Sequence, residues 1–121
     1  MVGMGPFLSH KDTPFRGEKS GTAELTLYLL AIVRLMLPET LIPATTALGT
    51  AEEGGRRQGI LWGANVVMPN LSPKAVRSKY MLYDNKLSSG SEAAESLYLL
   101  KQEMESIGFE ITVARGDSRM V

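Results

Sequence analysis

The chain has 121 residues, which is enough for one domain built around one hydrophobic core. Apolar residues make up 44% and charged residues 21%, a mixture typical of folded domains and not of disordered tails. Thirteen basic side chains balance thirteen acidic ones, which disfavours binding to nucleic acid or anionic membranes, and the absence of cysteine excludes disulfides and thiolate metal ligands from this chain.

The amino-terminal segment lacks the basic stretch followed by a longer apolar stretch that marks a secretory signal, so we expect a cytoplasmic protein. Residues 1–5 are apolar with small residues between them and predict a first strand. The chain would then begin directly on a strand, as though Met1 were an internal residue of a longer polypeptide. The polar residues 11–21 predict a loop.

A helix is expected over residues 24–37, where only Glu24, Thr26 and Arg34 are polar. This segment is shorter than the roughly 20 residues that cross a bilayer, so it predicts a buried helix and no membrane span. Thr22 is a suitable amino-terminal cap, and Pro38 ends the helix because proline has no backbone donor.

Two further short apolar runs, residues 41–48 and 64–68, predict strands on either side of a helix over residues 55–62. Alternating strands and helices imply parallel pairing, either in a doubly wound sheet or in a β/α barrel. Pro43 fits only the first residues of its strand, because a central strand position needs a backbone donor.

The last part of the chain predicts a helix over residues 91–107 and then a strand over residues 109–113. Ser89 and Glu92 match a capping box at the start of the helix, and Gly108 suits its left-handed end. A parallel sheet with so few strands leaves edges and apolar faces uncovered, so we expect the chain to be part of a larger fold and marginally stable alone.

Candidate binding residues lie where the expected strands end, because ligands bind at the carboxyl ends of parallel strands. Thr45 and Thr46, with Ala47, lie in the last part of the strand expected over residues 41–48 and could hold a carboxylate or another anion, or could simply complete the strand. His10 is the only histidine and lies in the loop near Asp12, which favours a solvated side chain and excludes a multi-histidine metal site.

Two other groups of polar residues carry weaker signals. The string Gly54-Gly55-Arg56-Arg57 is compatible with an anion-binding nest or an ordinary turn. Arg77, Tyr80 and Tyr83 share one side of a helix and could face a polar ligand or pack as an aromatic stripe.

Several strings in this chain resemble a known family: MVGMGPF, HKDTP, LMLPETLIPATTALGT, GANVVMPNLSP and RSKYMLYDNK. They are similar to the carboxyl-terminal part of the HydE family, the radical S-adenosylmethionine maturases of FeFe-hydrogenases, over residues 1–86. The remaining residues 87–121 resemble that family's tail, the biotin and thiamin synthesis-associated region, more loosely.

The resemblance implies an α/β fold, namely the last three parallel strands of a radical S-adenosylmethionine (β/α) TIM-type barrel with their helices, followed by a helix-strand extension. In the family a CxxxCxxC loop holds a 4Fe-4S cluster, at which S-adenosylmethionine is cleaved to a radical that attacks an organometallic iron–cysteine precursor. Other hydrogenase maturases are the implied partners. Because this chain has no cysteine, the chain alone is expected to be inactive.

By the same resemblance, Thr45, Thr46 and Ala47 would bind the carboxylate side of the substrate, and Met68 would line the cavity near the cofactor. Arg77, Tyr80 and Tyr83 would close the mouth of the cavity. No catalytic or metal-ligating residue is expected in this chain. Two alternatives stay open: a split-barrel or interaction subunit, and a fragment of a related enzyme of the biotin synthase or methylornithine synthase type.

Overall fold

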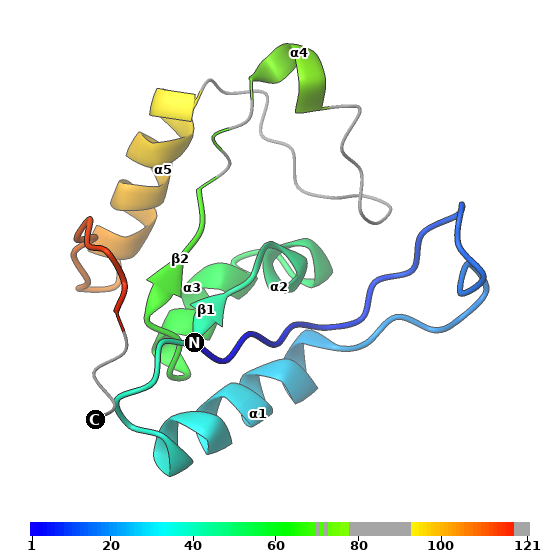
Figure 1. The fold of residues 1–121 in the computed structure, drawn as a ribbon, viewed down its shortest axis with the longest axis horizontal. Coiled ribbons are helices and arrows are strands. Elements are labelled where there is room, and N and C mark those ends of the chain that lie inside the picture. Colours follow the sequence, from blue (N-terminus) through cyan, green and yellow to red (C-terminus); the bar gives the residue numbers. More distant parts are fainter. Residues whose placement is uncertain (70, 72, 78–92, 118–121) are drawn as a thin grey trace.

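The computed structural model describes residues 1–69, 71, 73–77 and 93–117. Helices and short strands alternate along the chain, and Figure 1 shows the helices arranged around a small sheet. In chain order the elements are α1 (Ala23–Met36), β1 (Pro43–Ala44), α2 (Thr46–Ala51), α3 (Gly55–Leu61), β2 (Val66–Val67), α4 (Lys74–Arg77) and α5 (Ala93–Glu105).

Helix α1 forms within one residue of the expected bounds at each end. The Thr22 hydroxyl accepts a hydrogen bond from the Leu25 amide at 3.2 Å, as the sequence predicts, and the helix ends shortly before Pro38. The expectation of a buried helix holds for one face only: Leu27 and Leu30 are buried, whereas the opposite face is exposed. Only one face of the helix has a packing partner within the described residues, and the apolar residues on the other face remain in solvent.

The sheet consists of β1 and β2, which pair in parallel with Pro43 opposite Val66 and Ala44 opposite Val67. Parallel pairing is therefore confirmed for these two strands, and Pro43 occupies the first strand position, as expected. The predicted strand over residues 41–48 is too long, because helix α2 begins at Thr46. The Thr45 hydroxyl accepts from the Leu48 amide and so starts the helix directly after the strand.

Two other expected strands are absent from the described residues. Residues 1–5 run beside β1 but do not form a strand. The Val2 amide donates a hydrogen bond to the carbonyl of Leu41, just before β1, at 2.9 Å. Residues 109–113 alternate in sequence but are irregular, because no strand lies beside them to complete a ladder. The structure thus shows a mixed α/β arrangement with a small parallel sheet.

The core lies between the sheet and helices α1, α2, α3 and α5. Its largest fully buried side chains are Leu30, Ile42, Leu48, Leu100 and Met104. Helix α5 joins this core through Leu100 and Met104, and Gly108 ends the segment with a φ of 82°, the left-handed conformation that the sequence predicts. The expected capping pair Ser89 and Glu92 lies outside the described residues.

Helix α3 confirms the helix predicted over residues 55–62 and lies very close to β1. A side chain at Gly59 would approach the Ala44 Cβ atom to 3.1 Å and the Leu48 Cδ2 atom to 3.0 Å, so glycine permits the close packing of helix on strand. Among the described residues, no helix is both long enough and apolar enough to cross a membrane.

Candidate functional site

The predicted binding residues gather at the carboxyl edge of the small sheet. Thr45, Thr46 and Ala47 follow β1 and are half-buried, while Met68 follows β2 and is 44% exposed. The parallel register that pairs Ala44 with Val67 makes Thr45 and Met68 the next residues along the two strands. The structure therefore brings the threonine pair and Met68 to one edge of the fold, where parallel sheets hold ligands.

The two adjacent threonines differ in what their hydroxyl groups do. The Thr45 Oγ1 atom accepts from the Leu48 amide at 3.3 Å and so caps helix α2. The Thr46 hydroxyl makes no hydrogen bond within the described part of the chain, although the Thr46 carbonyl accepts from the Thr50 hydroxyl at 3.0 Å. Thr45 thus positions the helix, and Thr46 has a hydroxyl available for a polar ligand.

The amino-terminal segment forms a neighbouring wall of this edge. A Cβ atom at Gly5 would lie 2.7 Å from Thr45 Oγ1 and 3.6 Å from the Ala47 Cβ atom, so only glycine fits there without displacing Thr45. Sequence reasoning placed Gly5 at a strand end but missed this contact. Its signal is a glycine at the end of an apolar run, which on its own does not identify the neighbour.

A second positioning residue, Asn65, was also missed. Its Oδ1 atom accepts from the Ile42 amide at 2.8 Å, and its Nδ2 atom donates to the Thr40 carbonyl at 3.4 Å. The Asn65 amide also donates to the Ile42 carbonyl at 2.8 Å. Asn65 therefore fixes how the segments leading into β1 and β2 align, and thereby the positions of Thr45 and Met68 at the far ends of the strands.

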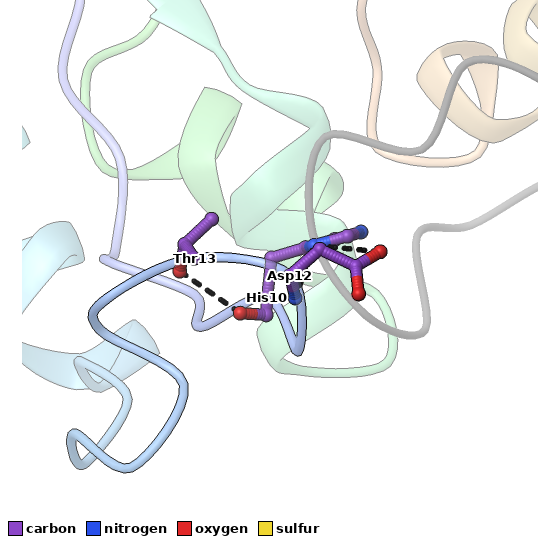
Figure 2. Close-up of polar contacts among 3 residues, drawn as sticks. All are labelled: His10, Asp12 and Thr13. Atoms are coloured by element: carbon purple, nitrogen blue, oxygen red, sulfur yellow. Dashed lines mark hydrogen bonds and ion pairs between the residues drawn. The ribbon is translucent and has the colours of Figure 1, made fainter.

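His10 lies in the predicted loop, where Figure 2 shows it with Asp12 and Thr13. Its Nδ1 atom accepts from the Asp12 amide at 3.1 Å and lies 3.9 Å from Asp12 Oδ2, while its carbonyl accepts from the Thr13 hydroxyl at 2.9 Å. The expectation of a solvated side chain is wrong, because the imidazole is only 14% exposed. These contacts make His10 a turn-forming residue whose Nδ1 atom is already engaged.

The loop that contains His10 is closed at its base. The Gly21 amide donates to the Phe7 carbonyl at 2.8 Å, and the rings of Phe7 and Phe15 meet edge to face with centroids 6.1 Å apart. The predicted loop over residues 11–21 is therefore confirmed, and it is a compact loop whose two ends lie together.

The remaining sequence candidates contribute no described contact to the sheet edge. Gly54 caps the start of α3 with a φ of 72°, and the Arg56 guanidinium pairs with Glu103 of α5 at 3.5 Å. Arg77 is the last residue of α4 and its side chain is outside the described atoms, as are Tyr80 and Tyr83 altogether. The roles expected for these last three residues stay predictions.

A metal site was not expected in this chain. Within the described residues, no three side chains of the histidine, cysteine, aspartate or glutamate type converge in a way that could hold a metal ion. The entire sequence lacks cysteine, so its residues do not fit a thiolate-held iron–sulfur cluster.

Comparisons with known proteins identify a similar protein. No protein-family model matches the chain. Over 87 residues, 72% of the chain, it is 51% identical to the [FeFe] hydrogenase maturase subunit HydE of Thermotoga maritima. The aligned region is 25% of that protein, so the chain spans about a quarter of the curated relative. The resemblance to HydE that the sequence motifs predict is confirmed.

Proposed function

We propose that this chain is a carboxyl-terminal portion of a HydE-type radical S-adenosylmethionine maturase that acts in assembly of the FeFe-hydrogenase H-cluster. The observation that carries the proposal is the 51% identity to HydE over 87 residues. The position of Thr45, Thr46 and Met68 at the carboxyl edge of a parallel sheet supports it, because this edge is where barrel enzymes bind their substrates.

The chain's contribution is to the cavity and not to the cluster. In the complete enzyme, S-adenosylmethionine and a 4Fe-4S cluster supply radical chemistry, but the cluster ligands must come from other sequence because this chain has no cysteine. We therefore assign to these residues the binding of substrate and the exclusion of water, and no part in holding the cluster.

Within this proposal, Thr46 is the residue most directly suited to the carboxylate side of the substrate. Its hydroxyl is not used by any described group and can donate a charge-assisted hydrogen bond. Ala47 offers a backbone donor at the start of α2, and Thr45 holds that start in place. Met68 presents an unreactive apolar side chain toward the cofactor, which suits a cavity that must protect a radical.

The mouth of the cavity is assigned by resemblance to Arg77, Tyr80 and Tyr83, whose guanidinium and phenol groups can close over a polar substrate. The organometallic iron–cysteine precursor is the proposed substrate, and the other hydrogenase maturases are the proposed partners.

A separate subunit that completes another chain's barrel is the second candidate function. The observation that favours it is the number of large apolar side chains left in solvent, among them Leu25, Met36 and Val113. Reading the coding DNA upstream separates the two candidates. An in-frame CxxxCxxC sequence supports the single-enzyme proposal, whereas an independent promoter and a stop codon immediately upstream support the separate subunit.

A fused protein tests the proposed cavity role. The part of the Thermotoga maritima relative that precedes its matched region is joined to this chain, and the product is assayed for maturation of FeFe-hydrogenase. We expect the unaltered fusion to be active. Thr46→Val keeps the size of the side chain but removes the hydroxyl, so kcat/KM should fall roughly tenfold to hundredfold, the effect of losing a hydrogen bond to a charged group.

Thr46→Ser is the matched control, because it keeps the hydroxyl and should retain most of the activity. An inactive unaltered fusion that is folded and loaded with its cluster would contradict the proposed function. Equal activity of the Thr46→Val and Thr46→Ser variants would contradict the role of Thr46 in substrate binding.

A further inference from the structure

Helix α1 carries a second apolar face in addition to the one that packs on the core. Leu25, Leu29, Ile32 and Met36 follow one another at the i, i+4, i+7 and i+11 spacing that forms one stripe on a helix. Leu25 is 58% exposed, Leu29 43% and Met36 72%, while Ile32 is half-buried. We call these four residues the free stripe; none of them is polar or charged.

The direction of the free stripe follows from the contacts of Arg34 on the same helix. The Arg34 Nε atom donates to the Gly63 carbonyl at 2.8 Å, and a Cβ atom at Gly63 would lie 2.7 Å from the Arg34 Cβ atom. This side of α1 therefore faces the end of α3. At about 100° per residue, Leu25, Leu29 and Met36 lie roughly 140 to 180° around the helix from Arg34. The free stripe points away from α3.

The order of the segments in the sheet points the same way. The Val2 amide bonds to the Leu41 carbonyl, so residues 1–5 lie on one side of the chain entering β1, and β2 lies beside β1 in parallel. Helix α1 lies between residues 1–5 and β1 in the chain, and α2 and α3 lie between β1 and β2 (Figure 1). In a series of right-handed β/α units, the helix of each unit packs between those of the units before and after it. The flank of α1 opposite α3 is where the helix of the preceding unit would lie.

We infer that the free stripe docks one amphipathic helix, that of the β/α unit preceding residues 1–5, which lies in the part of the HydE-type enzyme outside this chain. The inference rests on the proposed function. The choice of occupant rests on three observations: the chain spans about a quarter of its relative, the stripe lies on the flank opposite α3, and it has no charge to attract a charged partner. Leucine, isoleucine and methionine side chains at this spacing suit ridge-and-groove packing of two helices.

Single thiols test the inference, because the chain has no cysteine of its own. Leu29→Cys places a thiol in the free stripe, and Leu35→Cys places one on the outward side of the same helix, where Leu35 is 85% exposed. Each variant carries an affinity tag and is co-expressed with the part of the Thermotoga maritima relative that precedes its matched region. Maleimide labelling of the tagged chain is followed by mass spectrometry, alone and in the purified complex.

We expect Leu29→Cys to label readily in the free chain and roughly tenfold or more slowly in the complex, because docking covers that position. Leu35→Cys should label at the same rate in both states. Failure of the tagged chain to retain the other piece overturns the inference, and so does equal labelling of Leu29→Cys with and without it. Protection of Leu29→Cys by self-association of the free chain also overturns it, because the occupant is then a second copy.

This experiment and the test of the proposed function fail separately. The Thr46 variants are assayed in a fused protein, in which the two pieces are covalently joined and activity is the readout. The labelling experiment uses separate pieces and measures only whether the free stripe is covered. An active fusion with an unprotected Leu29→Cys would keep the proposed function and reject the docking surface.

Discussion

At the scale of single residues, Arg34 and Gly63 form the contact that joins α1 to the turn after α3. Besides the Gly63 carbonyl, the Arg34 guanidinium donates to the Pro38 carbonyl at 2.7 Å and to the Leu37 carbonyl at 3.4 Å. Gly63 has a φ of 115°, which side chains other than glycine rarely adopt, and its missing Cβ leaves room for Arg34. The pair depends on glycine for both backbone conformation and space.

Gly63→Ala should therefore destabilise the fold by about 1 to 3 kcal/mol, the range for a residue with a side chain held at positive φ. The measurement is the urea midpoint of the fused protein, followed by circular dichroism. Gly17→Ala is the control, since a Cβ atom there meets nothing within 4 Å. Equal midpoints for the two variants would show that Gly63 is not constrained in this way.

The residues at the carboxyl edge of the sheet show what could be predicted from the sequence at this scale. Local residue types mark the ends of strands, and on this basis we expected Thr45, Thr46, Ala47 and Met68 at strand ends. The structure places these residues directly after β1 and β2. The contact of Gly5 with Thr45 and the bonds of Asn65 to the chain before β1 could not be predicted. They join positions far apart in sequence, and nothing local to either residue specifies the partner.

At the scale of elements, helices were predicted better than strands for a physical reason. The bounds of α1 and α3 follow from caps, breakers and apolar spacing within each segment. A strand exists only where a neighbour completes its hydrogen bonds, so residues 1–5 and 109–113 have the pattern without the pairing. Thr45 was predicted to lie in a strand. Instead its hydroxyl accepts from the Leu48 amide, and this capping bond begins α2 where β1 could have continued.

The amino-terminal cap of α1 gives the prediction that belongs to this scale. Thr22→Ala removes the acceptor of the Leu25 amide and should lower the free energy of unfolding by about 1 kcal/mol. Thr22→Ser keeps the hydroxyl and should cost only a small part of that. The urea midpoints of the fused protein are compared. Similar losses for the alanine and serine variants would mean that the hydroxyl does not stabilise the helix.

At the scale of the whole molecule, the described residues leave much apolar surface in solvent. Leu25, Met36 and Val113 are among the large side chains that are mostly exposed, and the sheet formed by β1 and β2 is only two strands wide. Such a sheet is marginally stable without further partners. The surface is explained if the part of the HydE-type enzyme that lies outside this chain covers it, as we propose.

Thermal unfolding of the isolated chain tests that claim most directly, measured by differential scanning calorimetry beside the fused protein. The isolated chain should unfold in a broad transition with little heat and bind the dye ANS before heating, whereas the fusion should give one sharp transition that includes these residues. A sharp, two-state transition of the isolated chain as a monomer above about 60 °C, without dye binding, would contradict it.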